Sequence, residues 1–142
     1  MPTNANGAQL LVDTSAAIAF SVADHDHHEA TFGVLVGRRL GLAGHAAFET
    51  FSVLTRLPPP ARRTPATVAR LLAADFPYSR FLGPGAAATL FDELHERGIA
   101  GGAVYDALAG AVAREHDLPL ATRDQRALET YGALGVRVEL LS

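Results

Sequence analysis

The chain contains neither cysteine nor lysine among its 142 residues. Without cysteine it can form no disulfide, no thiolate zinc site and no cysteine nucleophile. Because all 12 of its cationic residues are arginine, a P-loop lysine and Schiff-base chemistry are also excluded. Any metal-dependent chemistry must therefore rest on carboxylates or histidines.

The chain also lacks a long hydrophobic run and a surplus of positive charge. Its apolar stretch over residues 10–23 is interrupted by Asp13 and no basic residue precedes it, so we predict neither a signal peptide nor a membrane span. The absence of cysteine suits a cytoplasmic location, which we expect. Because the net charge is −3, nucleic-acid binding would require local arginines or bound metal.

One domain is the expected organisation, because 142 residues with 49% hydrophobic content suffice for one core and not for two. We predict that it spans residues 1–142, with residues 1–8 as a frayed leader. Short apolar runs that predict strands alternate with longer stretches that predict helices. The predicted strands are residues 10–12, 40–43, 81–82, 118–121 and 136–140. The predicted helices are residues 15–19, 26–37, 45–57, 65–76, 85–98, 103–115 and a last one that ends near residue 131.

This alternation predicts an α/β fold with a short, mostly parallel sheet flanked by helices on both faces. Asp13 directly follows the first predicted strand, and Asp124 follows the fourth. In an open parallel sheet, ligands bind beyond the carboxyl ends of the strands, so these two aspartates should converge. The neighbouring hydroxyl groups of Thr14, Ser15 and Thr122 can orient a carboxylate or a metal-bound water.

Two further acids have alternative interpretations. Asp106 opens an apolar helix, where a carboxylate can serve the helix dipole alone. Glu49 borders the apolar stripe of its helix and can equally be a surface residue. Four carboxylates in one crevice would repel one another unless cations neutralised them, and an all-oxygen set suits magnesium or manganese. Such ions activate water and stabilise the leaving oxygen of a phosphodiester, which is nuclease chemistry.

Four acidic motifs occur in order along the chain: Leu11-Val12-Asp13-Thr14-Ser15, Glu49 in the middle helix, Gly101-Gly102-Ala103-Val104-Tyr105-Asp106-Ala107, and Ala121-Thr122-Arg123-Asp124. Together they resemble the motifs of the PIN-domain family in its VapC-type arrangement. Each motif is short, but their order and spacing agree over residues 9–141.

The resemblance implies a PIN-like three-layer fold and a metal-dependent endoribonuclease, the toxin of a toxin–antitoxin pair, which hydrolyses RNA with metal-activated water. It implies Ser15 and Thr122 as supporting hydroxyl groups. It also implies a homodimer and a small antitoxin protein that covers the active groove, with DNA contacted only through the antitoxin. The catalytic, metal-binding residues that it implies for Mg²⁺ or Mn²⁺ are Asp13, Glu49, Asp106 and Asp124.

Three other features bear on the site and its partners. Arg123 and Arg126 flank the last acid and are predicted to contact RNA phosphates. The run His25–Glu29 invites a metal-site interpretation, but Asp26 as N-cap with a glutamate three residues later favours a helix start. The Pro58–Pro60 connector departs from the family pattern and leaves the choice of partner and substrate open.

Two other functions remain open from the sequence. A phosphatase would use Asp13 as its nucleophile, although Ser15 occupies the place of the motif's second aspartate and no lysine is present. A catalytically silent interaction domain would use the same acids to bind an arginine of a partner. Metal titration distinguishes the nuclease from the silent domain, because a silent domain should bind no magnesium or manganese at millimolar concentration.

Overall fold

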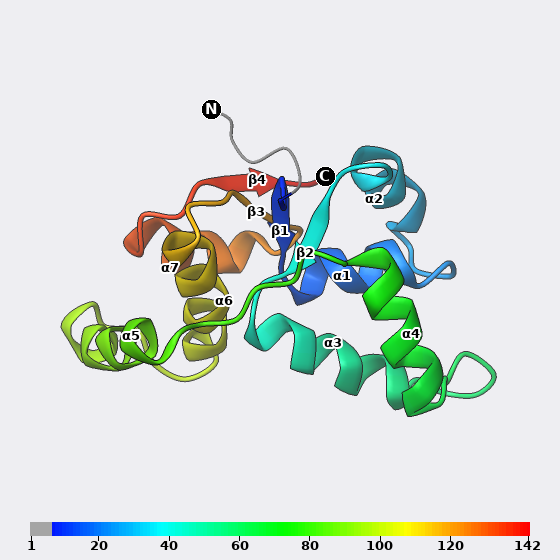
Figure 1. The fold of residues 1–142 in the computed structure, drawn as a ribbon, viewed down its shortest axis with the longest axis horizontal. Coiled ribbons are helices and arrows are strands. Elements are labelled where there is room, and N and C mark those ends of the chain that lie inside the picture. The colour runs from blue at the N-terminus through cyan, green and yellow to red at the C-terminus, as the bar shows by residue number, and fades with distance from the viewer. Residues whose placement is uncertain (1–6) are drawn as a thin grey trace.

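The computed structural model describes residues 7–142, which form a four-stranded parallel sheet with helices around it (Figure 1). The strand order is β2-β1-β3-β4. The chain passes from β1 to the neighbouring strand on one side, β2, and later returns to the neighbouring strand on the other side, β3. This reversal is the switch point at which open α/β sheets bind ligands. The strands are β1 (Leu10–Val12), β2 (Leu40–Leu42), β3 (Leu120–Thr122) and β4 (Val138–Leu140).

Helices cover both faces of the sheet, which confirms the predicted three-layer α/β fold (Figure 1). α1 to α4 contribute to the core on one face, and α6 and α7 on the other, with α5 packed outside α6. Across residues 7–142, no helix is both long and apolar enough to cross a bilayer. The helices are α1 (Thr14–Ser21), α2 (His28–Leu35), α3 (His45–Thr55), α4 (Pro65–Asp75), α5 (Pro84–Glu96), α6 (Ala103–Glu115) and α7 (Leu128–Ala133), with a 3₁₀ turn, η1 (Gln125–Ala127), before α7.

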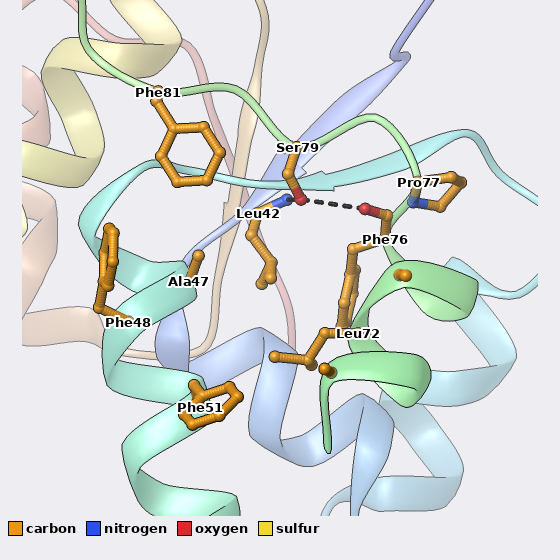
Figure 2. A pocket seen from close by; sticks show the side chains of 11 residues that line it. Leu42, Ala47, Phe48, Phe51, Leu72, Phe76, Pro77, Ser79 and Phe81 are labelled. Atoms are coloured by element: carbon orange, nitrogen blue, oxygen red, sulfur yellow. Dashed lines mark hydrogen bonds between the residues drawn. The ribbon is translucent and has the colours of Figure 1, made fainter. Parts of the chain in front are cut away.

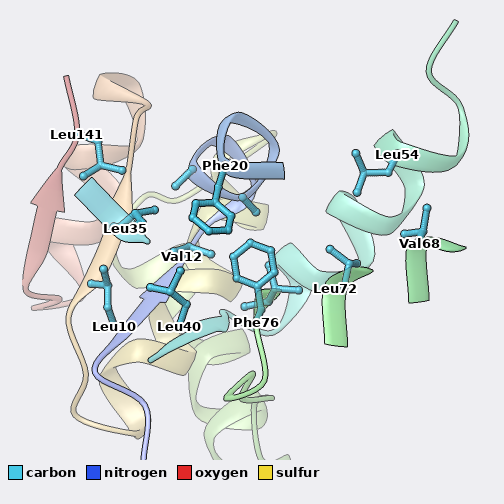
Figure 3. Packing of buried hydrophobic residues seen from close by; sticks show 14 residues of the cluster. Leu10, Val12, Phe20, Leu35, Leu40, Leu54, Val68, Leu72, Phe76 and Leu141 are labelled. Carbon is cyan, nitrogen blue, oxygen red and sulfur yellow. The ribbon is translucent and has the colours of Figure 1, made fainter. Parts of the chain in front are cut away.

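Side-chain alternation along the strands divides the core between the two faces. Leu10 and Val12 of β1 pack on the α1–α4 side, whereas Leu11 packs toward α6. Figure 3 shows the first of these clusters, in which the rings of Phe20 and Phe76 lie 5.6 Å apart. Burial on both faces explains why the first three strands are uninterrupted apolar or small-residue runs.

The strand predicted at residues 81–82 is wrong by a few residues. The preceding segment extends the sheet instead, because the backbone N–H groups of Tyr78 and Arg80 donate to the carbonyls of Leu40 and Leu42. A single parallel bridge joins Arg80 to Ala43, and the chain then turns toward α5. Which residues of this segment pair with β2 depends on the register between the two, and the local sequence does not encode that register.

A helix begins near Asp26 as predicted, but the N-cap predicted at Asp26 is wrong. α2 begins at His28, and its N-cap is His27, which makes no side-chain capping bond. Two backbone turns precede the helix, and the His28 ring lies 2.8 Å from the carbonyl oxygen of Ala19, which ties the start of α2 to α1. Of the leader predicted at residues 1–8, only Gly7 and Ala8 are described, and both are buried.

Candidate active site

Asp13 and Asp124 meet at the carboxyl edge of the sheet. Asp13 follows β1 directly and Asp124 follows β3 by two residues, and the backbone N–H of Asp13 donates to the carbonyl of Ala121. Both aspartates also cap the helix that follows, because the side chain of Asp13 accepts from the Ala16 N–H and that of Asp124 from the Arg126 N–H. The strand-to-helix turns therefore fix both carboxylates at the switch point.

The four predicted acids line one cavity of about 170 Å³. It joins the ends of β1 and β3 to α3 and α6, which carry Glu49 and Asp106. Four segments far apart in the sequence thus converge at one place, as predicted for the crevice. The lining residues are Asp13, Thr14, Ser15, Glu49, Tyr105, Asp106, Ala109, Asp124 and Tyr131.

Asp13 lines this cavity and is only 6% exposed. Its Oδ1 accepts from the Ser15 hydroxyl at 2.6 Å and from the backbone N–H of Ala16 at 3.2 Å. Its Oδ2 accepts from the phenol of Tyr131 at 2.7 Å. Three donors therefore offset the cost of burying this carboxylate and fix its orientation.

Glu49 and Asp106 both face the cavity, although each had a simpler interpretation from sequence. Glu49 Oε1 accepts a hydrogen bond of 2.9 Å from the Thr14 hydroxyl, so a residue of α1 holds it in place. Asp106 lies in the first turn of α6, but the N-cap of that helix is Gly102. Neither acid is an ordinary surface or capping residue.

Asp106 has the clearest electrostatic perturbation among the four acids. Burial is the largest of the causes that together raise the pKa of its carboxyl to about 6; the nearby charges of Asp124, Asp13 and Glu49 also raise it, in that order, while Arg126 lowers it. The rise in pKa therefore reflects burial first and, second, the repulsion among the carboxylates that share this site. A bound cation would remove this repulsion.

Ser15 and Thr122 organise the loop that carries Asp124. The Thr122 hydroxyl accepts from the backbone N–H of Asp124 at 3.0 Å, and the Ser15 hydroxyl accepts from that of Arg123 at 2.9 Å. The two hydroxyl oxygens lie 3.3 Å apart. They therefore link the loop after β3 to the turn after β1.

The two arginines beside Asp124 have different surroundings. The Arg123 guanidinium donates to the Thr31 hydroxyl at 3.1 Å and to the backbone oxygen of Ser142, so it is directed toward α2 and the end of the chain. Arg126 donates through Nε to Asp124 at 3.3 Å, and its side chain is 94% exposed. Arg126 is thus the arginine that borders the acidic site.

Tyr131 is a site residue that sequence reasoning missed. Its ring is fully buried, and burial together with the adjacent Asp13 raises the pKa of its phenol, which keeps the phenol a neutral donor. The ring packs against Gly110 of α6, where the Cβ of any larger residue would lie only 3.0 Å from it. Tyr131 and Asp13 are 118 positions apart, and no local pattern signals their contact.

The oxygen atoms that line the cavity are suitable ligands for a hard divalent cation. They are carboxylate and hydroxyl oxygens without nitrogen or sulfur, which is the set that magnesium and manganese prefer. Within residues 7–142, no three acidic or histidine side chains are already arranged as a complete metal-binding group, and this includes the run His25–Glu29. Binding of an ion by the acids of the cavity would therefore require their side chains to change orientation.

A second, larger cavity of about 450 Å³ is apolar and lies on the other side of α3 (Figure 2). Figure 2 shows Phe48 and Phe81 at its rim, with ring centroids 6.0 Å apart. The Ser79 hydroxyl closes one end, since it accepts from the Leu42 N–H and donates to the Phe76 carbonyl, both at 2.9 Å. We call this cavity the apolar groove; it is lined by Leu42, Ala47, Phe48, Phe51, Ala69, Leu72, Ala73, Phe76, Pro77, Ser79 and Phe81.

The chain is similar to known proteins over most of its length. The sequence profile of the PIN domain matches residues 10–133. Ribonuclease VapC27 of Mycobacterium tuberculosis is 46% identical over 129 residues, which cover 91% of this chain and 94% of that protein. Ribonuclease VapC40 of the same organism is 46% identical over 132 residues, which cover 92% and 97%.

Solved structures support the fold at lower identity. VapC20 of M. tuberculosis, described as a toxin that cleaves the sarcin-ricin loop, superimposes with a TM-score of 0.70 at 19% identity, covering 94% of this chain and 99% of that one. FitAB bound to a DNA fragment gives a TM-score of 0.65 at 17% identity over 92% and 94%. The chain belongs to the PIN-domain family, which confirms the resemblance predicted from its four motifs.

Proposed function

We propose that the chain is a magnesium- or manganese-dependent endoribonuclease that acts in the cytoplasm as the toxin of a toxin–antitoxin pair. The observation that carries the proposal is the convergence of four carboxylates, from four separate segments, on one cavity at the switch point of the sheet. The two relatives named as ribonucleases, each 46% identical to this chain, support RNA as the substrate.

The four acids would hold the cation, which when bound would supply activation of water and stabilise the charge that develops on the phosphodiester. Tyr131 and Ser15 keep Asp13 oriented, and Thr14 does the same for Glu49. Arg126, exposed beside Asp124, would position an RNA phosphate. We assign that contact to Arg126 before Arg123, whose guanidinium is directed to Thr31.

The surroundings of Asp13 do not favour the phosphatase alternative. Both of its carboxylate oxygens accept hydrogen bonds, from Ser15 and Ala16 on one side and from Tyr131 on the other. These bonds stabilise the anion and lower its reactivity as a nucleophile. The same bonds hold the carboxylate in a fixed orientation, which suits a cation-binding role.

The antitoxin is proposed to occupy the apolar groove. The groove and the acidic cavity lie on either side of α3, where the adjacent residues Phe48 and Glu49 line one each. A partner segment with apolar side chains for the groove and an arginine for the carboxylates would match both surfaces. We also propose a homodimer, from the resemblance to the family.

The direct test is cleavage of a mixed RNA pool by the purified chain with magnesium or manganese, beside EDTA. We expect discrete products that disappear in EDTA and in the Asp106→Asn variant. Asp92→Asn is the matched control, because Asp92 is an exposed aspartate on α5, outside the cavity. Undiminished metal-dependent cleavage by Asp106→Asn would overturn the proposal. No metal binding at all would favour a silent interaction domain.

A further inference from the structure

We propose that the stacked pair of Tyr105 and His45 is a platform on which a nucleobase of single-stranded RNA docks. The inference rests on the proposed ribonuclease function. It deepens that function, because it assigns a place to a base of the substrate as well as to the phosphate that is cut.

Tyr105 lies at the mouth of the acidic cavity. It lines the cavity, directly precedes Asp106 in α6, and is 51% exposed. Of the large exposed hydrophobic side chains within residues 7–142, it is the one that lines this cavity. It belongs to none of the buried clusters of the described part of the chain. Core packing therefore does not account for this ring.

The Tyr105 ring is held in a defined orientation by its partner. The centroids of Tyr105 and His45 lie 5.1 Å apart and their planes differ by 18°, so the two rings are stacked. His45 begins α3, one helical turn before Glu49, and Tyr105 lies in the first turn of α6. The pair thus bridges the two helices that carry two of the four acids. An aromatic surface ordered before binding loses little conformational entropy when a ligand stacks on it.

A nucleobase is the ligand that matches such a surface beside carboxylates. Proteins recognise single-stranded RNA by stacking its bases on aromatic side chains, which is tolerant of sequence because every base has a π face. Each base is joined through one sugar to the neighbouring phosphate. A base next to the cleaved phosphate therefore has Tyr105 within reach while the phosphate is at the acids.

The test compares Tyr105→Leu, Tyr105→Trp and, as a matched control, Phe91→Leu, since Phe91 on α5 is exposed but lies outside the cavity. The first measurement is the binding of a single-stranded RNA oligonucleotide that contains 2-aminopurine, in the presence of calcium. Fluorescence anisotropy reports binding, and quenching of the 2-aminopurine fluorescence reports stacking. We expect the wild type, Tyr105→Trp and Phe91→Leu to bind and quench, and Tyr105→Leu to bind about tenfold more weakly or worse without quenching.

The second measurement is steady-state cleavage with manganese. We expect Tyr105→Leu to raise KM with kcat nearly unchanged, as loss of ground-state stacking requires. Unchanged binding and KM in Tyr105→Leu would overturn the platform. A loss of kcat together with a lower Tm would also overturn it, because the pair would then only join α3 to α6.

These outcomes separate the two proposals. If the wild type binds and quenches the oligonucleotide but cleaves no RNA with any metal, the ribonuclease proposal fails and the platform stands. If the wild type cleaves RNA and Tyr105→Leu matches it in KM, only the platform fails. If the wild type binds no single-stranded RNA in calcium, the platform is overturned.

Discussion

Asp13 shows how single residues prepare the site. It is nearly fully buried, and a buried carboxylate without hydrogen-bond donors is costly. Donors from Ser15, Ala16 and Tyr131 meet both of its oxygens. These three contacts therefore fix the orientation of Asp13 in the cavity.

The contact between Tyr131 and Asp13 predicts the effect of removing one hydroxyl group. Tyr131→Phe should keep the ring in its place beside Gly110 but leave Asp13 Oδ2 without its donor. We expect the Kd for manganese to rise by about 10- to 100-fold, as for other partners of metal ligands. Titration calorimetry measures this. Tyr78→Phe is the control, because Tyr78 lies outside the cavity, and an unchanged Kd in Tyr131→Phe would contradict the account.

The raised pKa of Asp106 predicts how stability depends on pH without metal. The folded pKa of about 6 exceeds the ordinary value of 3.8, so the folded state holds the proton more tightly. This group's contribution to stability is therefore present below about pH 4 and is lost as pH rises through 6. In EDTA, the Tm of Asp106→Asn minus that of the wild type should grow over this range. A pH-independent difference would contradict the assignment.

At the scale of the elements, close packing at Gly41 predicts a local sensitivity. A Cβ at Gly41 of β2 would lie 2.2 Å from the backbone oxygen of Tyr78, in the segment that extends the sheet. Gly41→Ala should therefore lower the free energy of unfolding by about 1–3 kcal/mol, as other overpacked substitutions do. Urea denaturation measures this change.

The control is Gly33→Ala in α2, where a Cβ would meet nothing within 4 Å. Alanine is the better helix former, so this variant should be about 0.5–1 kcal/mol more stable than the wild type. Equal effects of the two substitutions would contradict the packing described for β2.

The elements also show what the sequence could and could not predict. Apolar runs and helix periodicity predicted four strands and the bounds of α6, because these depend on local patterns. The strand predicted at residues 81–82 and the cap at Asp26 were wrong, because pairing with β2 and packing against α1 decide them.

The site could be predicted in part for the same reason. Asp13 and Asp124 follow strands, and the topology of an α/β sheet brings such positions together. Glu49 and Asp106 lie on helices, and tertiary packing decides whether such side chains face the cavity or the solvent. Their place in the cavity was therefore ambiguous from the sequence. Tyr131 contacts Asp13 across 118 positions, and a single sequence offers no signal for that contact.

At the scale of the whole molecule, the apolar groove and the acidic cavity make separable predictions. Phe48→Ser with Phe81→Ser should preserve RNA cleavage while weakening binding of the antitoxin, because exposed aromatic side chains dominate such interfaces. Titration calorimetry with the antitoxin purified from the native complex measures this, with Phe91→Ser as the control. Tight binding by the double variant would contradict the proposed site. Conversion of a dimer to a monomer would assign the groove to a second copy of the chain.

We propose that the four carboxylates bind the cation on which RNA cleavage depends. The most direct test measures manganese binding by calorimetry and RNA cleavage on the same preparation over one range of manganese concentration. We expect cleavage to rise with manganese occupancy, and we expect Asp106→Asn to lose binding and cleavage together, whereas Asp92→Asn loses neither. Cleavage that is complete before manganese binds, or that persists in EDTA, would contradict it.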